Sequence, residues 1–363
     1  MPRKERILAL IRENPFIAQQ ELAGRLGITR SAVASHIAQL TREGRLLGRA
    51  YVLPGEEPIL VAGGANLDRI ATGAGPVRPG TSNPVTTRET FGGVARNVAE
   101  NLAHLGLPVR LMTVLGEDAA GEALARQAQA CGIDTGASRS VPGGRTGTYT
   151  ALLQPDGELV LGMADMGILD AFTPAFMQER RPRWAMTRMR VVDCNLPAEA
   201  LSGFIEDSRR SDAQLVVVAV SEPKMARLPA SLAGVLVLLL NRGELAVRVG
   251  RDLSDRAGLV AACREVQAQG ARSVVVTLGP EGTLGCWDAE QPFFLPAPAV
   301  QVVDVTGAGD AFSSGVVASL ARHPGDLSRA CRLGQRLAAL TLASPASVAP
   351  GLSPALLDDP SER

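Results

Sequence analysis

The chain has 363 residues, of which 46% are apolar and 20% charged, with equal numbers of acidic and basic side chains. This length suits one large α/β domain and one small module, and the composition excludes fibrous and intrinsically unfolded proteins. Residues 1–53 carry nine Lys and Arg against four Asp and Glu, whereas the remainder carries 28 against 33. A basic domain over residues 1–54 and an acidic domain over residues 58–355 are therefore expected to have different partners.

No segment predicts a membrane span or an exported protein. The longest apolar run, 235–240 with its flanks, is far shorter than the roughly 20 residues that a membrane helix needs. The charged residues 1–6 lead directly into a periodic helix without the apolar core of a signal peptide, so we expect a cytoplasmic protein. The five cysteines are scattered and odd in number, which indicates reduced thiols and not disulfides or a zinc site.

The N-terminal residues predict three short helices. An apolar stripe runs over 3–13 and stops at Asn14-Pro15, and a second helix over 18–26 ends at Gly27. Thr29 can then cap a third helix, in which Val33, Ile37 and Leu40 form the apolar stripe. Residues 45–53 read as two short strands, so the whole segment predicts a helix-turn-helix followed by a wing.

The third helix and the wing present side chains that can meet phosphates or base edges. These are Arg30, Ser31, Ser35 and His36 on the helix, and Arg45 and Arg49 in the wing. The segment resembles winged helix-turn-helix domains of bacterial regulators, which implies a DNA partner. A role in protein interaction or dimerisation alone is the alternative. A net charge of only +5 predicts weak non-specific affinity, so useful DNA binding would need a dimer on two half-sites.

From Pro58 onward, apolar runs alternate with helical stretches, and this alternation predicts a doubly wound α/β sheet. The candidate strands are residues 59–63, 109–114, 191–193, 215–220, 235–240 and 273–277. A hairpin over 146–153 and 158–163, with Pro155-Asp156-Gly157 at its turn, interrupts this pattern. We interpret it as a small β-lid over a substrate cleft, built from parts of about residues 69–90 and 145–165.

Residues 302–312 form the most informative segment, in which a strand runs into glycines, then Asp310, then a helix over 311–322. Glycines allow backbone N–H groups to approach an anion at a helix N-terminus. A carboxylate beside bound phosphate has a natural role in accepting the proton of an attacking hydroxyl group. The simpler alternative is that Asp310 only caps the helix.

The sequence Asp304-Val-Thr-Gly-Ala-Gly-Asp310 resembles the C-terminal signature of the PfkB, or ribokinase-like, carbohydrate kinases. Residues 91–97, which enter a helix expected over 98–105, are similar to the family's Gly-Gly signature, and the resemblance extends over about 60–353. It implies an ATP-dependent kinase with Asp310 as catalytic base. The backbone amides of Gly307, Ala308 and Gly309 would form the anion hole for the transferring phosphoryl group.

The same resemblance implies a substrate site. Asp68, Gly93 and Asn97 would hold substrate hydroxyl groups, since a carboxylate and an amide together offer donors and acceptors. Within the family, residues 82–84, 93–97, 148–149, 164–166 and 192–195 resemble pseudouridine kinases. Thr148 and Asp165, on the lid, would then contact the substrate. Alone, Asp68, Asn97 or Asp165 could equally be turn or cap residues.

The cofactor sites follow from three further matches. Asn241-Arg-Gly-Glu244 matches the family's Asn-x-x-Glu motif, in which Glu244 helps to hold Mg²⁺ through water. Thr277, Gly279 and Gly282 lie in the loop that borders ATP, together with Asn241. Asp304 and Thr306, with the loop over 343–351, match a region that binds a monovalent cation in many family members, so a dependence on K⁺ is left open.

One departure and several alternatives remain. Residue 219 is Ala where the family pattern has an Asp, which puts a metal or phosphate contact in doubt, although Glu222 could compensate.

The expected reaction is phosphorylation of a ribonucleoside 5′-hydroxyl group, with pseudouridine as the first candidate substrate. The alternatives are a purine-nucleoside or sugar kinase, and a ligand-sensing transcription regulator with a weakly active kinase fold. Because small β-lids in this family often pair across a two-fold axis, a homodimer is a further expectation.

Overall fold

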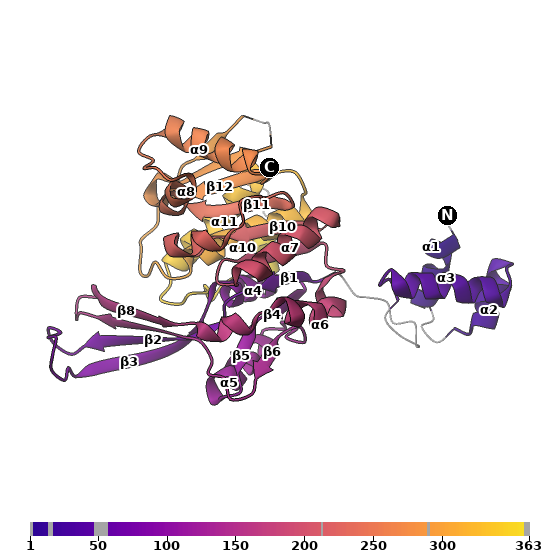
Figure 1. Cartoon of the computed structure of the whole chain (residues 1–363), viewed down its shortest axis with the longest axis horizontal. Helices are drawn as coiled ribbons and strands as arrows, with labels where there is room; N and C mark the ends of the chain where they lie inside the picture. Colours follow the sequence, from indigo (N-terminus) through magenta and orange to yellow (C-terminus); the bar gives the residue numbers. More distant parts are fainter. Residues whose placement is uncertain (1–2, 14–16, 47–56, 212, 289–290, 359–363) are drawn as a thin grey trace. The chain divides into compact units, whose positions relative to one another are not determined.

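The computed structural model describes residues 3–13, 17–46, 57–211, 213–288 and 291–358 (Figure 1). The chain divides into two compact units, residues 1–57 and 58–363. Over the described ranges, every helix is too short or too polar to cross a membrane.

The first unit contains α1 (Arg3–Glu13), α2 (Gln19–Leu26) and α3 (Arg30–Arg42). The predicted cap residues are in place: Gly27 has the left-handed φ of 63°, and the Thr29 hydroxyl group accepts a hydrogen bond from the Ala32 amide at 3.2 Å. The three apolar stripes pack into one small core around Ile7, Leu22 and Val33. Residues 47–53 of the predicted wing lie outside the described residues.

The second unit is built on an eight-stranded sheet with the order β14-β13-β12-β11-β10-β9-β1-β4. The strands are β1 (Ile59–Ala62), β4 (Val109–Met112), β9 (Met189–Asp193), β10 (Gln214–Val218), β11 (Val235–Asn241), β12 (Ser273–Thr277), β13 (Thr283–Trp287) and β14 (Phe293–Leu295). Along this order, neighbouring strands from β12 to β4 pair in parallel, whereas β13 pairs antiparallel with β12 and with β14. The predicted doubly wound sheet is confirmed.

Helices cover both faces of this sheet. On one face, α4 (Val94–His104), α10 (Ala308–Arg322) and α11 (Leu327–Leu342) pack against Ile59 and Val61. On the other, α6 (Pro174–Trp184), α7 (Ala198–Arg210), α8 (Arg242–Val249) and α9 (Arg256–Ala268) pack against Leu60 and Ala62. Because both faces are buried, the strands read as continuous apolar runs. α5 (Ala119–Ala130) and the short helices η1 (Gly167–Ala171), η2 (Glu222–Arg227), η3 (Gly279–Glu281) and η4 (Pro354–Leu357) complete the unit.

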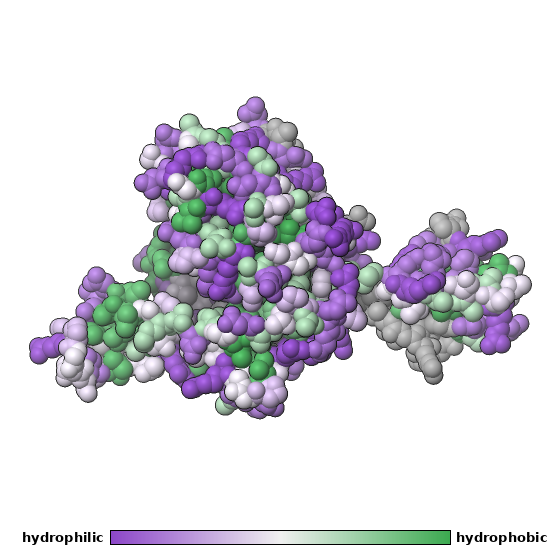
Figure 2. All heavy atoms as spheres, viewed as in Figure 1, coloured by the Kyte–Doolittle hydropathy of each residue, from purple (hydrophilic) through white to green (hydrophobic). Residues whose placement is uncertain are grey.

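A separate four-stranded sheet projects from this body (Figure 1) and has the order β3-β2-β7-β8. Its strands are β2 (Asn66–Gly73), β3 (Val85–Gly92), β7 (Thr148–Leu153) and β8 (Leu159–Asp165). We call it the lid. Figure 2 shows apolar side chains gathered on its surface, and Leu159, Leu161 and Met163 of β8 are each about half exposed.

Three predicted element boundaries differ from those in the structure. The strand expected over 109–114 divides into β4 and β5 (Val114–Gly116), which pairs with β6 (Arg139–Val141), because the Thr113 amide donates to the Ser138 hydroxyl group instead of continuing the ladder. The helix expected over 98–105 begins at Val94, and the helix expected over 311–322 begins at Ala308. Both helices start directly after a glycine with positive φ, Gly93 and Gly307.

Candidate active site

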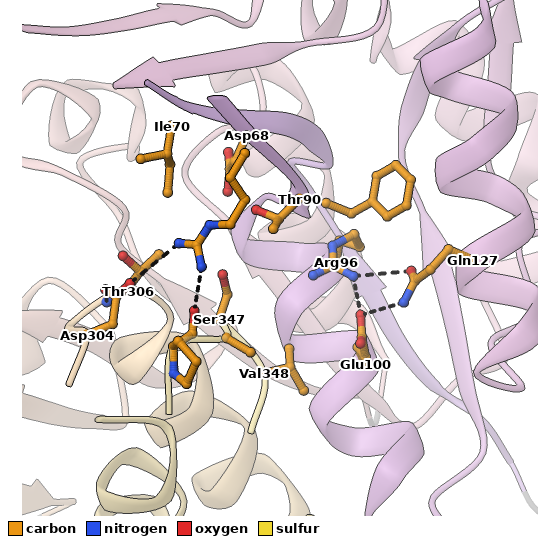
Figure 3. A pocket seen from close by; sticks show the side chains of 14 residues that line it. Asp68, Ile70, Thr90, Arg96, Glu100, Gln127, Asp304, Thr306, Ser347 and Val348 are labelled. Carbon is orange, nitrogen blue, oxygen red and sulfur yellow. Dashed lines mark hydrogen bonds and ion pairs between the residues drawn. The ribbon is translucent and has the colours of Figure 1, made fainter. Parts of the chain in front are cut away.

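Two pockets lie close to the predicted catalytic residues. The sheet-end pocket opens where β10, β11 and β12 end beside the start of α10, and the lid pocket opens beneath β2 and β3 (Figure 3). Ligands in doubly wound folds bind at this carboxyl edge of the sheet. Among the predicted residues, the sheet-end pocket is lined by Asn241, Glu244, Thr277, Gly309 and Asp310. The lid pocket is lined by Asp68, Asp304 and Thr306.

The start of α10 is the candidate anion-binding turn, because its backbone geometry suits a bound anion. Gly307 is its N-cap, with a φ of 80°, and a Cβ atom there would lie 2.1 Å from the Ser347 carbonyl oxygen. Only glycine fits this close approach. The N–H groups of a first helical turn have no partner within the helix; that of Ala308 makes a long 3.4 Å bond to the Val305 carbonyl oxygen. Since the helix begins at Ala308, the backbone of 307–309 belongs to this turn and faces the positive end of the helix dipole.

Asp310 lies in the first turn of α10 and accepts a hydrogen bond from Asn97 on α4, with Nδ2 2.7 Å from Oδ2. The orientation of the Asn97 amide is fixed from its other side, where Arg96 Nη2 donates to Asn97 Oδ1 at 2.6 Å. Arg96 is buried and also pairs with Glu100 and Gln127 (Figure 3). The chain of contacts from Glu100 to Asp310 therefore directs an N–H donor at the carboxyl group.

The pKa of Asp310 is raised to about 7. Desolvation of the carboxyl group is the largest cause, and the hydrogen bond from Asn97 opposes it. The negative charges of Asp193 and Asp68 raise the pKa further, whereas Arg96 lowers it. A carboxyl group with a pKa near neutrality is suited to accept a proton during a reaction and to release it afterwards.

Asp68 lies at the base of the lid, on β2, and accepts a hydrogen bond from Asn66 at 2.5 Å. Its carboxylate rests on the Cα atom of Gly92, where a Cβ atom would come within 2.0 Å of Oδ2. Burial raises the pKa of Asp68, while Asn66 and Arg96 lower it. Asp68 and Arg96 both line the lid pocket, whereas Asn97, predicted to share the substrate site with Asp68, lines neither pocket.

Asn241 and Glu244 form a reciprocal capping box at the start of α8. The Asn241 Oδ1 atom accepts from the Glu244 amide at 2.9 Å, and Glu244 Oε2 accepts from the Asn241 amide at 2.7 Å. The Asn-x-x-Glu motif therefore has a structural role, and it also places the buried Glu244 at the sheet-end pocket. Desolvation raises the pKa of Glu244, and the nearby charge of Glu222 raises it further.

Ala219 lines the sheet-end pocket without a carboxylate, and Glu222 lies near Glu244. A Cβ atom on Gly243 would lie 2.2 Å from Glu222 Oε1, so this carboxylate rests against the first turn of α8. Glu222 and Glu244 thus bring two hard oxygen donors to one region, a donor set that fits Mg²⁺ with several of its waters retained.

The predicted nucleotide loop follows β12. Thr277 lines the sheet-end pocket, while Gly279 begins η3 and Gly282 follows it, with φ values of 58° and 108°. Glu281 of this loop pairs with Arg242 of α8 at 2.5 Å, so the loop and the capping box are tied together.

Asp193 is a site residue that the sequence reasoning missed. It is buried at the end of β9, and its Oδ2 atom accepts from the amides of Gly64 and Ala95, both at 2.9 Å. Oδ1 accepts from the Asn195 amide at 2.8 Å. One carboxylate therefore fixes the turn after β1 against the start of α4, which carries Asn97. The segment 192–195 had been singled out for its resemblance to pseudouridine kinases, but the acid that ends this buried apolar strand was given no role.

The lid residues Thr148 and Asp165 are cross-strand neighbours on β7 and β8. Neither lines the sheet-end pocket or the lid pocket, and Asp165 is exposed. Gly93 does not line a pocket either; its φ of 98° and its contact with the Gly64 carbonyl group start α4. The structure thus divides the predicted metal residues between the two pockets and leaves these two lid residues outside both.

The first unit presents its predicted DNA-contacting residues on α3. Arg30, Ser31 and Ser35 are exposed, and His36 is partly buried. Arg45 forms an ion pair with Glu5 at 2.7 Å, so its charge is partly neutralised. Arg49 lies outside the described residues.

Comparison with known proteins gives two family matches. Residues 57–353 match the model of the pfkB family of carbohydrate kinases, and residues 2–46 match that of a winged helix-turn-helix DNA-binding domain. An uncharacterized sugar kinase of Escherichia coli, YeiI, is 34% identical over 320 residues, covering 87% of each chain. The pseudouridine kinase of Escherichia coli is 28% identical over 258 residues, covering 71% of this chain and 82% of its own.

Solved structures agree with these matches. A carbohydrate kinase from Agrobacterium tumefaciens has a TM-score of 0.72 and 31% identity, covering 83% of this chain and 96% of its own. A sugar kinase from Clostridium perfringens has a TM-score of 0.73 and 25% identity, covering 84% of this chain and 95% of its own.

Proposed function

Because the chain belongs to the pfkB family of carbohydrate kinases, we propose that it transfers the γ-phosphoryl group of ATP to the 5′-hydroxyl group of a ribonucleoside, with pseudouridine as the preferred substrate. The observation that carries the reaction is the geometry around Asp310. A carboxyl group with a pKa of about 7 lies in the first turn of a helix whose N-terminus is built to hold an anion.

In this reaction, Asp310 accepts the proton of the attacking hydroxyl group as its oxygen bonds to the γ-phosphorus atom and the bond to ADP breaks. The amides of Gly307, Ala308 and Gly309 stabilise the charge on the transferring group. Mg²⁺, held near Glu244 and Glu222, would neutralise charge on the phosphates. Asn97 keeps the Asp310 carboxylate oriented.

The choice of substrate rests on the lid half of the site. The segments that resemble pseudouridine kinases include Asn97 and Asp193, and the partly buried carboxylate of Asp68 is suited to ribose hydroxyl groups. A sugar is the second candidate, because the chain has higher identity to the sugar kinase YeiI than to the pseudouridine kinase.

We further propose that the first unit binds DNA through Arg30, Ser31, Ser35 and His36. Its match to a winged helix-turn-helix domain and the exposure of the first three side chains support this role. An α3 recognition helix would lie in the major groove.

The test is ATP consumption with Mg²⁺ over a panel of pseudouridine, uridine, inosine, guanosine, cytidine, adenosine and ribose. We expect the highest kcat/KM with pseudouridine and a 5′-phosphorylated product by ³¹P NMR. A preference for another nucleoside or for ribose would overturn the substrate while keeping the chemistry. Binding of a nucleoside without turnover would instead favour a ligand-sensing regulator.

A further inference from the structure

One arginine of the lid contacts the loop that supports the anion-binding turn. Arg88 lies on β3, and its Nη1 atom donates to the Pro345 carbonyl oxygen at 3.3 Å. Its Nη2 atom lies 4.0 Å from Asp304 Oδ2. The guanidinium group therefore bridges the lid, the segment before α10 and the loop after α11.

The two segments that Arg88 joins also shape the turn at Gly307. The other Asp304 oxygen, Oδ1, accepts from the Thr306 amide at 2.8 Å. The Ser347 carbonyl group, two residues after Pro345, is the one that packs against the Gly307 Cα atom. A positive charge between Asp304 and Pro345 thus holds together the parts that place the anion-binding amides.

A carboxylate oxygen and backbone carbonyl oxygens are hard donors that also suit a monovalent cation. Here, a guanidinium group already holds the Pro345 carbonyl group and faces Asp304. A second positive charge at the same donors would be repelled by the first. The residues present therefore do not fit a K⁺ ion beside Arg88.

We propose that Arg88 supplies the positive charge that K⁺ would otherwise supply at this loop, so that the protein works without a monovalent cation. Because β3 belongs to the lid, the charge is carried by the substrate-covering sheet and couples it to the helix of Asp310. The effect on turnover rests on the kinase function proposed above, whereas the effect on cation binding does not.

The experiment compares the wild type with Arg88→Ala in tetramethylammonium and in potassium buffers of equal ionic strength. For the wild type, we expect kcat/KM to differ by less than about twofold between the two salts. In Arg88→Ala, kcat/KM should fall about tenfold in tetramethylammonium and recover largely in K⁺, because the vacated donors can then bind the ion. Arg88→Lys should stay independent of K⁺.

The matched control is Arg69→Ala. Arg69 is also a lid arginine, about half exposed, but it pairs with Glu89 on the neighbouring lid strand at 2.7 Å. It should show no K⁺ dependence. A wild type that K⁺ activates severalfold, or an Arg88→Ala variant equally slow in both salts, would overturn the proposal.

A thermal-shift measurement separates this proposal from the proposed reaction. K⁺ should raise the melting temperature of Arg88→Ala, since a cation that binds only the folded state stabilises it, and should leave the wild type and Arg69→Ala unchanged. This measurement does not require turnover. It therefore tests the proposal about Arg88 even if no compound in the substrate panel is phosphorylated. If K⁺ stabilises the wild type as much as Arg88→Ala, the arginine does not replace the ion.

Discussion

Asp310, Asn97 and Arg96 form a single electrostatic unit. The raised pKa of the carboxyl group results from desolvation together with the charges of Asp193 and Asp68, and Asn97 offsets part of it. If Asp310 is the base, as proposed, these contacts set the pH at which it can accept a proton, and a pH–rate profile measures that pH.

We expect kcat/KM of the wild type to rise with pH up to about 7 and then to level, because only ionised Asp310 accepts a proton. In Asn97→Ala the carboxylate loses its donor, so the acid limb should move to higher pH. A pH–rate profile with saturating ATP measures both. An acid limb at the same pH in both proteins would contradict the assignment of that limb to Asp310.

For individual residues, the sequence analysis predicted those that lie within short motifs. It missed those whose contacts are far away in the sequence. Asp310 and the glycines before it were predicted from a local pattern, and Asp68 from the family resemblance. Arg96 was not, although it stands next to Asn97, because its role depends on the contact that Asn97 makes 213 positions away. Asp193 was missed for the same reason, since it bonds to Gly64 and Ala95 across 129 and 98 positions.

Among the elements, α8 combines an observed capping box with the proposed Mg²⁺ site at Glu244. The capping box holds Glu244 in place, so removal of the cap should change both stability and the Mg²⁺ requirement.

Asn241→Ala should cost about 1 kcal/mol of unfolding free energy and raise the Mg²⁺ concentration for half-maximal activity about tenfold. Urea unfolding and a magnesium titration measure the two effects. Asp255→Ala is the matched control, since Asp255 caps α9 through a 2.7 Å bond to the Gly258 amide. It should lose similar stability without a change in the Mg²⁺ titration; a shift of equal size in both variants would remove Glu244 from the metal site.

The lid offers a second test among the elements. Leu161 and Met163 lie on one face of β8, beyond the register shift at its start, and are 51% and 50% exposed; a second copy of the chain would cover such a face by two-fold symmetry. We expect a dimer in light scattering that Leu161→Asp converts to a monomer, whereas Ala164→Asp, on the other face of the strand, leaves it intact. A wild type that is monomeric at high concentration would refute the lid dimer.

Strand positions followed from the sequence more closely than helix starts. The apolar runs mark the buried strands because both faces of the sheet are covered. The starts of α4 and α10 depend instead on Gly93 and Gly307, whose positive φ is fixed by close contact with distant backbone, and no local pattern reveals such a contact.

Over the whole molecule, a basic unit and an acidic unit share one chain. If the first unit binds DNA independently of the kinase reaction, substitutions on its surface should leave kinase activity unchanged.

Arg30→Ala should weaken binding about tenfold to a duplex selected by the wild type from a random pool, while kcat and KM stay unchanged. Fluorescence anisotropy at fixed salt measures the affinity. Arg25→Ala, on exposed α2 and paired with Glu21 at 2.7 Å, is the control. Equal DNA affinity for all three proteins would favour a domain that serves protein interaction.

The most direct test of the kinase assignment is the turnover of Asp310→Asn with the best substrate of the panel, together with nucleoside binding by calorimetry. We expect kcat to fall about a thousandfold and the Kd to stay within about threefold of the wild type. The fold should persist: the raised pKa means that wild-type stability falls as pH rises from about 4 to 7, so the variant should melt no lower at pH 8. An Asp310→Asn variant that binds nucleoside and turns over at the wild-type rate would contradict the account.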